Sequence, residues 1–332
     1  FLLTEADLMT VPVPLVRKAL ANYFTRHPYC ASFELTYNCN ACCQHCHRGP
    51  HIPEEQLASP RRLLEICNEI RHIVAIKSGG EPLTRTELDE IVRLFKAEAS
   101  PIRIFVNTNG ALLTKKRFDG LKSAGVDEFL ISFDFPDERH DEWRAIPGLF
   151  RTIESLVSQL SPADRGRVVL TSVNTSQNFR EAVKMAEVAL DWGVNINYST
   201  YTWLRTDDMS LMVQPEDIPE FRGVIDQLLA MKREHGHILT SDWVLLGMAR
   251  FFLREDQGMC RAGERSMVVN PDGTFSPCGL LIRDFKTRKE MLRDFTSTNT
   301  CVDCYTSTRA NSEKPAKYIF LDHVPYLRRS VS

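Results

Sequence analysis

The sequence alternates short β-rich runs with helical patterns, and this alternation restricts the fold more than any other feature. The β-rich runs begin 26 to 40 residues apart. Each interval has room for one strand, one helix and two loops, which is the spacing of a parallel sheet built from βαβ units. The expected strands are Phe33–Tyr37, Ile73–Lys77, Ile102–Asn107, Phe129–Phe133, Val168–Val173 and Val194–Ser199.

The segments between these strands carry the caps and apolar stripes of helices. Ser59 is placed to cap a helix that has Pro60 in its first turn. Thr84 and Glu87 have the spacing of a capping box ahead of a second apolar stripe. We therefore expect each strand to be followed by a helix that packs on the sheet.

Six such units fit between residues 32 and 235, whereas a closed eight-unit barrel takes roughly 250 residues. We expect an α/β fold: a partial (β/α)6 TIM-like barrel, or an open doubly wound sheet, with the active site at the carboxyl ends of the strands. Residues 1–31 are expected to form a helical lead-in packed over the barrel through Val16, Leu20 and Phe24. In residues 236–332 the alternation of strand and helix patterns stops, and these residues are expected to form a small C-terminal domain.

Charge and hydropathy exclude several classes of protein. Lys and Arg number 41 and Asp and Glu 43, without a basic block, so no nucleic-acid partner is expected. The sequence has no run of 18 apolar residues, so no membrane span is predicted, and no signal peptide is recognised at the start. The ten cysteines fall into two groups with none between residues 68 and 259, which favours metal ligation in a reducing compartment, the cytoplasm, over disulfides.

The first group places Cys39, Cys43 and Cys46 in a C-x3-C-x2-C pattern directly after the first expected strand. Thiolates are the usual protein ligands of iron–sulfur clusters. A loop of this length can reach three corners of a cubane cluster, which leaves the fourth iron open, as in catalytic metal sites. The alternative is a zinc site that uses the three cysteines with His45 or His47.

This loop resembles the cluster-binding motif of the radical S-adenosylmethionine (SAM) superfamily. The resemblance implies a [4Fe-4S] cluster whose open iron holds the amino and carboxylate groups of SAM. Reductive cleavage would then give methionine and a 5′-deoxyadenosyl radical, which abstracts hydrogen from the substrate. Cys42 falls outside the motif and is expected to be a small packed residue. His45 stands where the family usually has an aromatic residue, and its ring can still lie beside the adenine.

Motifs at the later strand ends resemble the SAM-binding segments of the family. Gly79–Pro82 resembles the stretch that hydrogen-bonds the amino group of SAM, and Ser132 the residue that reaches its ribose or carboxylate. Arg144 is suited to pair with the SAM carboxylate; a surface ion pair with Asp137 or Asp141 is the alternative. The implied cofactor-binding residues are His45, Gly79, Gly80, Glu81, Pro82, Asn109, Ser132, Arg144 and Asn174.

The second group frames the segment 270–273, Asn-Pro-Asp-Gly, which reads as a hairpin turn. The pattern resembles the start of the SPASM auxiliary-cluster domain, cut short as in the smaller twitch variant. It implies one fully ligated auxiliary [4Fe-4S] cluster for electron transfer or structural support. A zinc ribbon would use the same four thiols. The implied ligands are Cys260, Cys278, Cys301 and Cys304.

The resemblance defines the initiating chemistry better than the substrate. The expected reaction is oxidation (dehydrogenation) or rearrangement of a small polar metabolite such as a sugar or aminocyclitol, with an external one-electron donor such as flavodoxin or ferredoxin. The alternative is modification of a peptide or a lipid-like substrate, which the shortness of residues 1–31 disfavours because peptide-modifying relatives carry a leader-recognition domain there. An interpretation of another class is a non-enzymatic zinc or iron–sulfur interaction protein. The residues considered for contact with the substrate are Tyr198, Tyr201, Arg205 and Asp242.

Overall fold

The computed structural model describes residues 17–18, 21–22, 24–46, 52, 54–99, 103–281 and 283–315. Eight strands form one sheet in the order β6-β5-β4-β3-β2-β1-β7-β8. All neighbouring pairs are parallel except β7 and β8. The strands are β1 (Cys30–Thr36), β2 (Val74–Gly79), β3 (Arg103–Thr108), β4 (Glu128–Ser132), β5 (Val168–Asn174), β6 (Asn195–Thr200), β7 (Ser266–Val269) and β8 (Phe275–Ser276).

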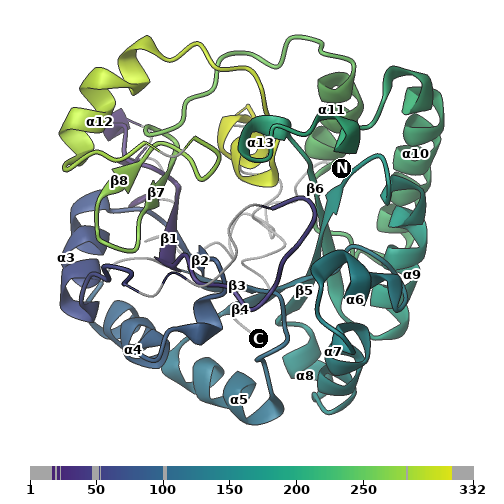
Figure 1. The fold of residues 1–332 in the computed structure, drawn as a ribbon, viewed down its shortest axis with the longest axis horizontal. Coiled ribbons are helices and arrows are strands. Elements are labelled where there is room, and N and C mark those ends of the chain that lie inside the picture. Colours follow the sequence, from purple (N-terminus) through teal and green to yellow (C-terminus); the bar gives the residue numbers. More distant parts are fainter. Residues whose placement is uncertain are drawn as a thin grey trace.

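Helices surround the outside of strands β1 to β6, as Figure 1 shows. All six expected strands are present within three residues of their predicted limits, and the α/β partial barrel is confirmed. The helices are α3 (Pro60–Ile70), α4 (Leu88–Glu98), α5 (Lys115–Ala124), α6 (Arg139–Arg144), α7 (Leu149–Ser158), α8 (Pro162–Arg165), α9 (Ala182–Asp191), α10 (Ile218–His235), α11 (Asp242–Phe252), α12 (Arg288–Asp294) and α13 (Ser307–Glu313). The 3-10 turns are η1 (Pro82–Thr84), η2 (Phe179–Glu181), η3 (Trp203–Arg205), η4 (Met209–Leu211), η5 (Pro215–Asp217) and η6 (Thr296–Thr298).

The start of α3 follows the sequence expectation, whereas the start of α4 does not. Ser59 caps α3 by accepting a hydrogen bond from the backbone N–H of Arg62. The predicted capping box of Thr84 and Glu87 is wrong: Thr84 ends η1, and its hydroxyl donates to the carbonyl of Glu81 at 2.7 Å. Helix α4 begins at Leu88 without a side-chain cap, because the preceding 3-10 turn already uses Thr84.

The core lies between the sheet and the outer helices. On β1, every second side chain (Ala31, Phe33 and Leu35) is fully buried, as the two-residue period of a strand requires. Phe33 packs edge-on against Phe95 of α4, with ring centroids 5.1 Å apart. Burial of one such ring contributes roughly 1.5–3 kcal/mol, so this layer holds β1 and its outgoing loop in place.

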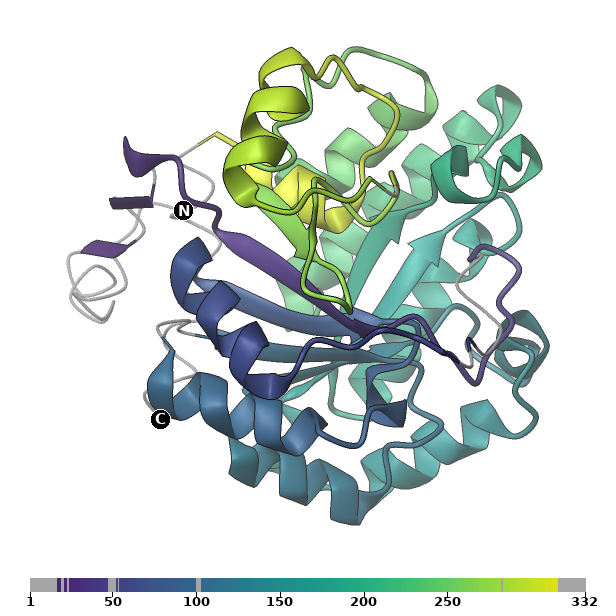
Figure 2. The same ribbon diagram turned by 60° about the vertical axis from the view of Figure 1, so that its left-hand side comes forward.

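The C-terminal segment continues the sheet instead of standing apart from it. Strand β7 pairs parallel with β1, from Cys30 opposite Ser266 to Phe33 opposite Val269, and Figure 2 shows the two strands side by side. The expected hairpin turn at residues 270–273 is confirmed, since it joins the antiparallel pair of β7 and β8. The sheet thus brings the second cysteine group back to the strand that carries the first.

The lead-in segment was expected to pack through an apolar face. Val16 and Leu20 lie outside the described residues, and Phe24 is 79% exposed, so it does not pack as expected. Asn22 of this segment is buried, and its amide donates to the carbonyl oxygens of Pro28 and Arg71. In the part of the chain that the structure describes, no helix has the length and apolar content to cross a membrane.

Candidate active site

A cavity of about 260 Å³ opens at the carboxyl ends of the parallel strands, where the fold predicts a site. Each of strands β1 to β6, or the loop directly after it, contributes to the wall. Two residues come from the C-terminal segment. The lining residues are Cys39, Ala41, Cys43, His45, Cys46, Gly79, Gly80, Asn107, Thr108, Asn109, Ser132, Arg144, Val173, Ser199, Thr200, Tyr201, Thr202, Arg205, Leu280 and Thr306.

The loop after β1 presents Cys39, Cys43 and Cys46 to this cavity. Its turn is closed by a hydrogen bond of 3.1 Å from the N–H of Cys46 to the carbonyl of Cys43. Burial raises the pKa of Cys39 to about 11 and also raises that of Cys43, so these sulfurs need a metal or a cation to exist as thiolates. Cys42 is exposed, so the expectation that it packs inside is wrong.

The zinc alternative requires side chains that converge on a single ion. Among the described residues, no three His, Cys, Asp or Glu side chains converge closely enough to hold one metal ion. His47, considered as a zinc ligand, lies outside the described residues. A cubane cluster distributes its thiolates over separate irons, and Cys39, Cys43 and Cys46 all line the same cavity.

Gly79 and Gly80 hold the cysteine loop by close backbone contact. The N–H of Gly80 donates to the carbonyl of Thr36 at 2.7 Å, and the next N–H donates to the carbonyl of Asn38 at 2.8 Å. A Cβ on Gly80 would come within 2.6 Å of the Tyr37 carbonyl and closer still to that of Asn38. Only glycine allows this approach, so the pair has a structural role beside its place on the cavity wall.

Glu81 ties the end of β2 to the end of β3. Its buried carboxylate accepts hydrogen bonds from the N–H of Leu83, the hydroxyl of Thr108 and the N–H of Asn109 at 2.7–3.0 Å. Burial raises its pKa, although these donors act in the opposite direction. Asn109 in turn donates from its amide to the side chain of Asn40 at 2.7 Å. The network therefore braces the cysteine loop from two neighbouring strand ends.

Arg144 pairs with Asp134, and not with Asp137 or Asp141 as the sequence alternative had it. Its Nε lies 2.8 Å from Oδ2 of Asp134, and its Nη1 donates to Sγ of Cys43 at 3.6 Å. Burial acts to raise the pKa of Asp134, but Arg144 and two neighbouring histidines keep it below its ordinary value. A fixed guanidinium thus lies beside the sulfur of Cys43, where it stabilises negative charge.

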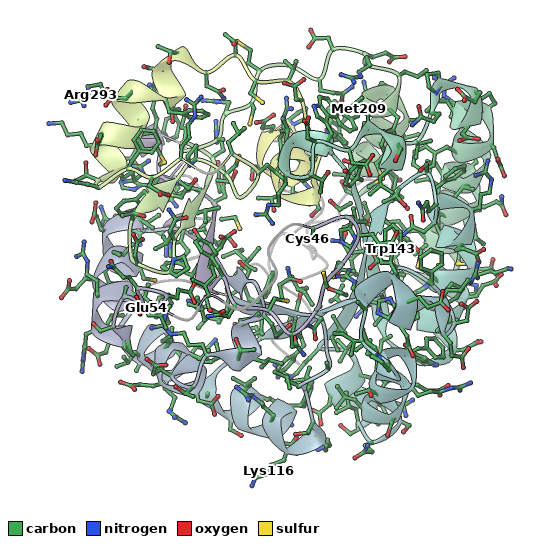
Figure 3. All side chains as sticks on the ribbon, in the orientation of Figure 1. Cys46, Glu54, Lys116, Trp143, Met209 and Arg293 are labelled. Atoms are coloured by element: carbon green, nitrogen blue, oxygen red, sulfur yellow. The ribbon has the colours of Figure 1, made fainter. Side chains whose placement is uncertain are left out.

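His45 lies against Trp143 of α6, with ring centroids 5.4 Å apart and planes 15° apart. Figure 3 shows Cys46 near the middle of the view, with Trp143 toward the adjoining helices. Burial, followed by the charge of Arg144, lowers the pKa of His45 to about 4, so the ring is neutral. Its Nδ1 is buried and has no hydrogen-bond partner among the described residues, which fits a ring placed to meet a ligand.

Six of the nine expected cofactor-binding residues line the cavity, and three do not. Glu81 and Pro82 lie behind the wall, and Asn174 is buried with its amide 3.7 Å from the sulfur of Met248. The six that line it are His45, Gly79, Gly80, Asn109, Ser132 and Arg144.

The residues considered for substrate contact also divide. Tyr201 and Arg205 line the cavity. Tyr198 is fully buried and donates to the carbonyl of Ala182 at 2.7 Å, whereas Asp242 pairs with Lys232 on the surface at 2.8 Å. Sequence reasoning missed the hydroxyls of Thr200, Thr202 and Thr306, although the first two follow a predicted strand end, where the fold places a site.

The second cysteine group is also brought together. The N–H of Cys260 donates to the carbonyl of Cys301 at 3.0 Å, and the charge of Cys278 acts on Cys304 and that of Cys304 on Cys260. Burial raises the pKa of Cys304 to about 11, while Arg309 favours its thiolate. All ten cysteines of the chain are free thiols, so none of these four is engaged in a disulfide.

The class of this protein follows from the fold, the site and a family comparison. Residues 33–189 match the family model of the radical SAM superfamily, and this stretch includes the three cavity cysteines and five of the six barrel strands. The chain therefore contains a radical SAM domain at these residues.

Curated relatives are similar to parts of this chain. The AdoMet-dependent heme synthase of Methanosarcina barkeri is 33% identical over 218 residues, which are 63% of this chain and 60% of that protein. Two further AdoMet-dependent heme synthases align over 31% and 44% of their own lengths. The chain thus spans less than two thirds of these relatives. The mycofactocin maturase MftC of Mycobacterium tuberculosis is 25% identical over 296 residues, 86% of this chain and 73% of that protein.

Solved structures share the fold. SuiB of Streptococcus suis bound to the precursor peptide SuiA has a TM-score of 0.61 at 14% identity, covering 84% of this chain and 68% of that one. Native anSMEcpe with bound AdoMet has a TM-score of 0.59 at 16% identity, covering 87% and 84%. At these identities the likeness establishes the architecture.

Proposed function

We propose that this chain cleaves SAM reductively at the strand-end cavity and uses the resulting radical to modify a peptide. The observation that carries the proposal is the gathering of Cys39, Cys43 and Cys46 on one wall of that cavity, with a guanidinium against Cys43. A [4Fe-4S] cluster held by these cysteines would supply both the electron for cleavage and an open iron for SAM.

The remaining wall residues divide the work of holding SAM. The neutral ring of His45 offers a face for the adenine, and Ser132 and Asn109 offer hydrogen bonds to its polar groups. Arg144 stabilises the charge of the thiolates and carries the nearest guanidinium for the SAM carboxylate. Gly79, Gly80 and Glu81 position the loop, while Pro82 and Asn174 support the wall from behind.

The relatives favour a peptide substrate over the sugar or aminocyclitol that the sequence first suggested. The similarity to mycofactocin maturase extends over 86% of this chain. Two structures of the same architecture are described with a bound peptide, SuiB with SuiA and anSMEcpe with Cp18Cys. A second candidate, modification of a tetrapyrrole, is favoured by the 33% identity to a heme synthase.

The second cysteine group is assigned to one auxiliary [4Fe-4S] cluster, with Cys260, Cys278, Cys301 and Cys304 as ligands. Four thiols would saturate it, so we assign it to electron transfer or structural support. An external one-electron donor such as flavodoxin or ferredoxin completes the system in a reducing compartment, the cytoplasm, which suits ten free thiols.

The first test is production of 5′-deoxyadenosine from SAM under dithionite in anaerobic conditions. The triple variant Cys39→Ala, Cys43→Ala, Cys46→Ala is expected to produce none and to lose about four of about eight irons per chain. Cys42→Ala is the matched control, because this exposed thiol lies in the same loop, and it should retain both. Undiminished production by the triple variant would refute the site.

The second test addresses the substrate. A pooled library of short peptides is expected to raise the yield of 5′-deoxyadenosine and to give products changed in mass. Stimulation by aminocyclitols or by a carboxylated tetrapyrrole, with no response to peptides, would move the assignment to that class. The double variant Cys301→Ala, Cys304→Ala should keep cleavage of SAM while losing most of the product.

A further inference from the structure

Arg205 lies where the two cysteine groups approach each other. It ends η3, directly beyond β6, and its guanidinium contacts three separate segments. Nη1 donates toward Sγ of Cys46 at 3.8 Å, and Nη2 donates to the carbonyl of Gly279, the residue after Cys278. Nη2 also lies 3.8 Å from a carboxylate oxygen of Glu34 on β1.

The segment after Cys278 packs closely on this side chain. Its side chain is 18% exposed and belongs to the cavity wall. A Cβ on Gly279 would lie 3.0 Å from the carboxylate of Glu34 and 3.5 Å from the guanidinium of Arg205. The Cys278 loop therefore lies directly on the ion pair, which holds the guanidinium in one orientation. A planar fork can bond two loops at once, which the single ammonium of lysine does less well.

The charge of Arg205 acts on residues near both cysteine groups. It favours the thiolate of Cys278, although burial dominates and raises the pKa of that thiol. On the other side it adds to the effects that keep His45 neutral, after burial and Arg144. Arg144 contacts only the first group, through Cys43, and Arg309 lies at the second group beside Cys304.

We infer that Arg205 is a positioning residue that couples the two clusters: it holds the Cys278 loop against the Cys46 loop, and its charge stabilises the reduced state of both. The inference rests on the proposed function, because it needs a cluster in each group. A positive charge close to a cluster makes addition of an electron more favourable, so one guanidinium between two clusters raises both reduction potentials together.

The test is a redox titration of each cluster, followed by electron paramagnetic resonance, in the full chain with both clusters reconstituted. The variants are Arg205→Gln, which removes the charge, and Arg205→Lys, which retains it. The matched control is Arg254→Gln: this arginine lies over the Trp203 ring of the same 3-10 turn at 4.4 Å and contacts the sulfur of Met209. Signals are assigned with the triple variant of the first group and the double variant of the second.

Arg205→Gln is expected to lower both reduction potentials by about 59 mV. For a one-electron couple this shift lowers the ratio of reduced to oxidised cluster about tenfold at a fixed solution potential. Arg205→Lys should recover most of this loss, and Arg254→Gln should shift neither potential. Equal potentials in Arg205→Gln and Arg254→Gln, or a shift confined to one cluster, overturn the coupling. Absence of two iron–sulfur signals from the wild-type chain would instead overturn the proposed function.

If Arg205→Gln fails to retain iron, Arg205→Lys still decides the matter. This variant keeps the charge and is expected to keep both clusters with potentials near those of the wild type. A Lys variant with normal iron content whose two potentials fall as far as those expected for the Gln variant would show that charge is not what Arg205 contributes.

Discussion

Replacement of Gly80 by alanine tests the brace of the cysteine loop most directly. The new methyl group would collide with two backbone carbonyls, those of Tyr37 and Asn38. Neither can move like a flexible side chain, so the loop or the end of β2 must shift. The collision puts at risk two hydrogen bonds, from Gly80 to Thr36 and from the next residue to Asn38.

The expected cost follows from these contacts. Overpacking in a closely packed site costs about 1–3 kcal/mol, and each weakened hydrogen bond adds about 0.5–1.5 kcal/mol. A loss of about 2–6 kcal/mol is therefore expected. A chain of 332 residues has an unfolding entropy of about 0.7 kcal/mol/K, so the melting temperature should fall by roughly 3–9 °C.

The assay compares Gly80→Ala with Gly223→Ala by thermal melting followed by circular dichroism, with iron content measured on the same samples. Gly223 lies within α10 and has open space where a Cβ would stand, so alanine should stabilise that helix by about 0.5–1 kcal/mol. The Gly80 variant should also retain less iron. If the Gly80 variant has the same melting temperature and iron content as the Gly223 variant, the contacts of Gly80 do not brace the cysteine loop as described.

Two further predictions concern buried charged groups. Glu81→Gln should destabilise the protein by about 1–3 kcal/mol, because an amide nitrogen cannot accept the bonds now made to one carboxylate oxygen, and a denaturation midpoint equal to wild type would contradict the network. Lys77→Met should stabilise the protein by several kcal/mol at pH 6, because the lysine ammonium is fully buried, has no hydrogen-bond partner among the described residues and lies 3.2 Å from the centre of the Phe95 ring. Burial lowers the pKa of Lys77 to about 7 in the folded state, so the unfolded chain binds the extra proton between pH 7 and about 10.4. Wild-type stability should rise with pH across that window, relative to the Met variant; parallel pH profiles would show that Lys77 is not buried as described.

The sequence predicted the barrel because its information is local and repeated. Each β-rich run, such as Val168–Val173, predicts a strand from its own residues. The spacing of the first three motif cysteines likewise lies within a single loop. The capping box at Thr84 failed because Pro82 imposes a 3-10 turn that uses the same hydroxyl.

Partners that depend on tertiary packing were harder to predict. Arg144 had three nearby aspartates in sequence, and the choice of Asp134 depends on burial that no spacing reveals. Pairing of β7 with β1 joins residues far apart in the chain, and so does the contact of Arg205 with Cys46. Such contacts are set by how the sheet closes, and local patterns do not encode that.

The parallel pairing of β1 with β7 affects how the chain is made. On the ribosome, β1 emerges 236 residues before its outer neighbour, counted from Cys30 to Ser266. Until then that edge of the nascent sheet has unsatisfied backbone groups, which invite pairing with other chains. A chain that stops before residue 266 would keep this edge open, with the first cysteine loop attached to an incompletely paired strand. The strand that carries the first cysteine loop is therefore fully paired only after β7 has been synthesised.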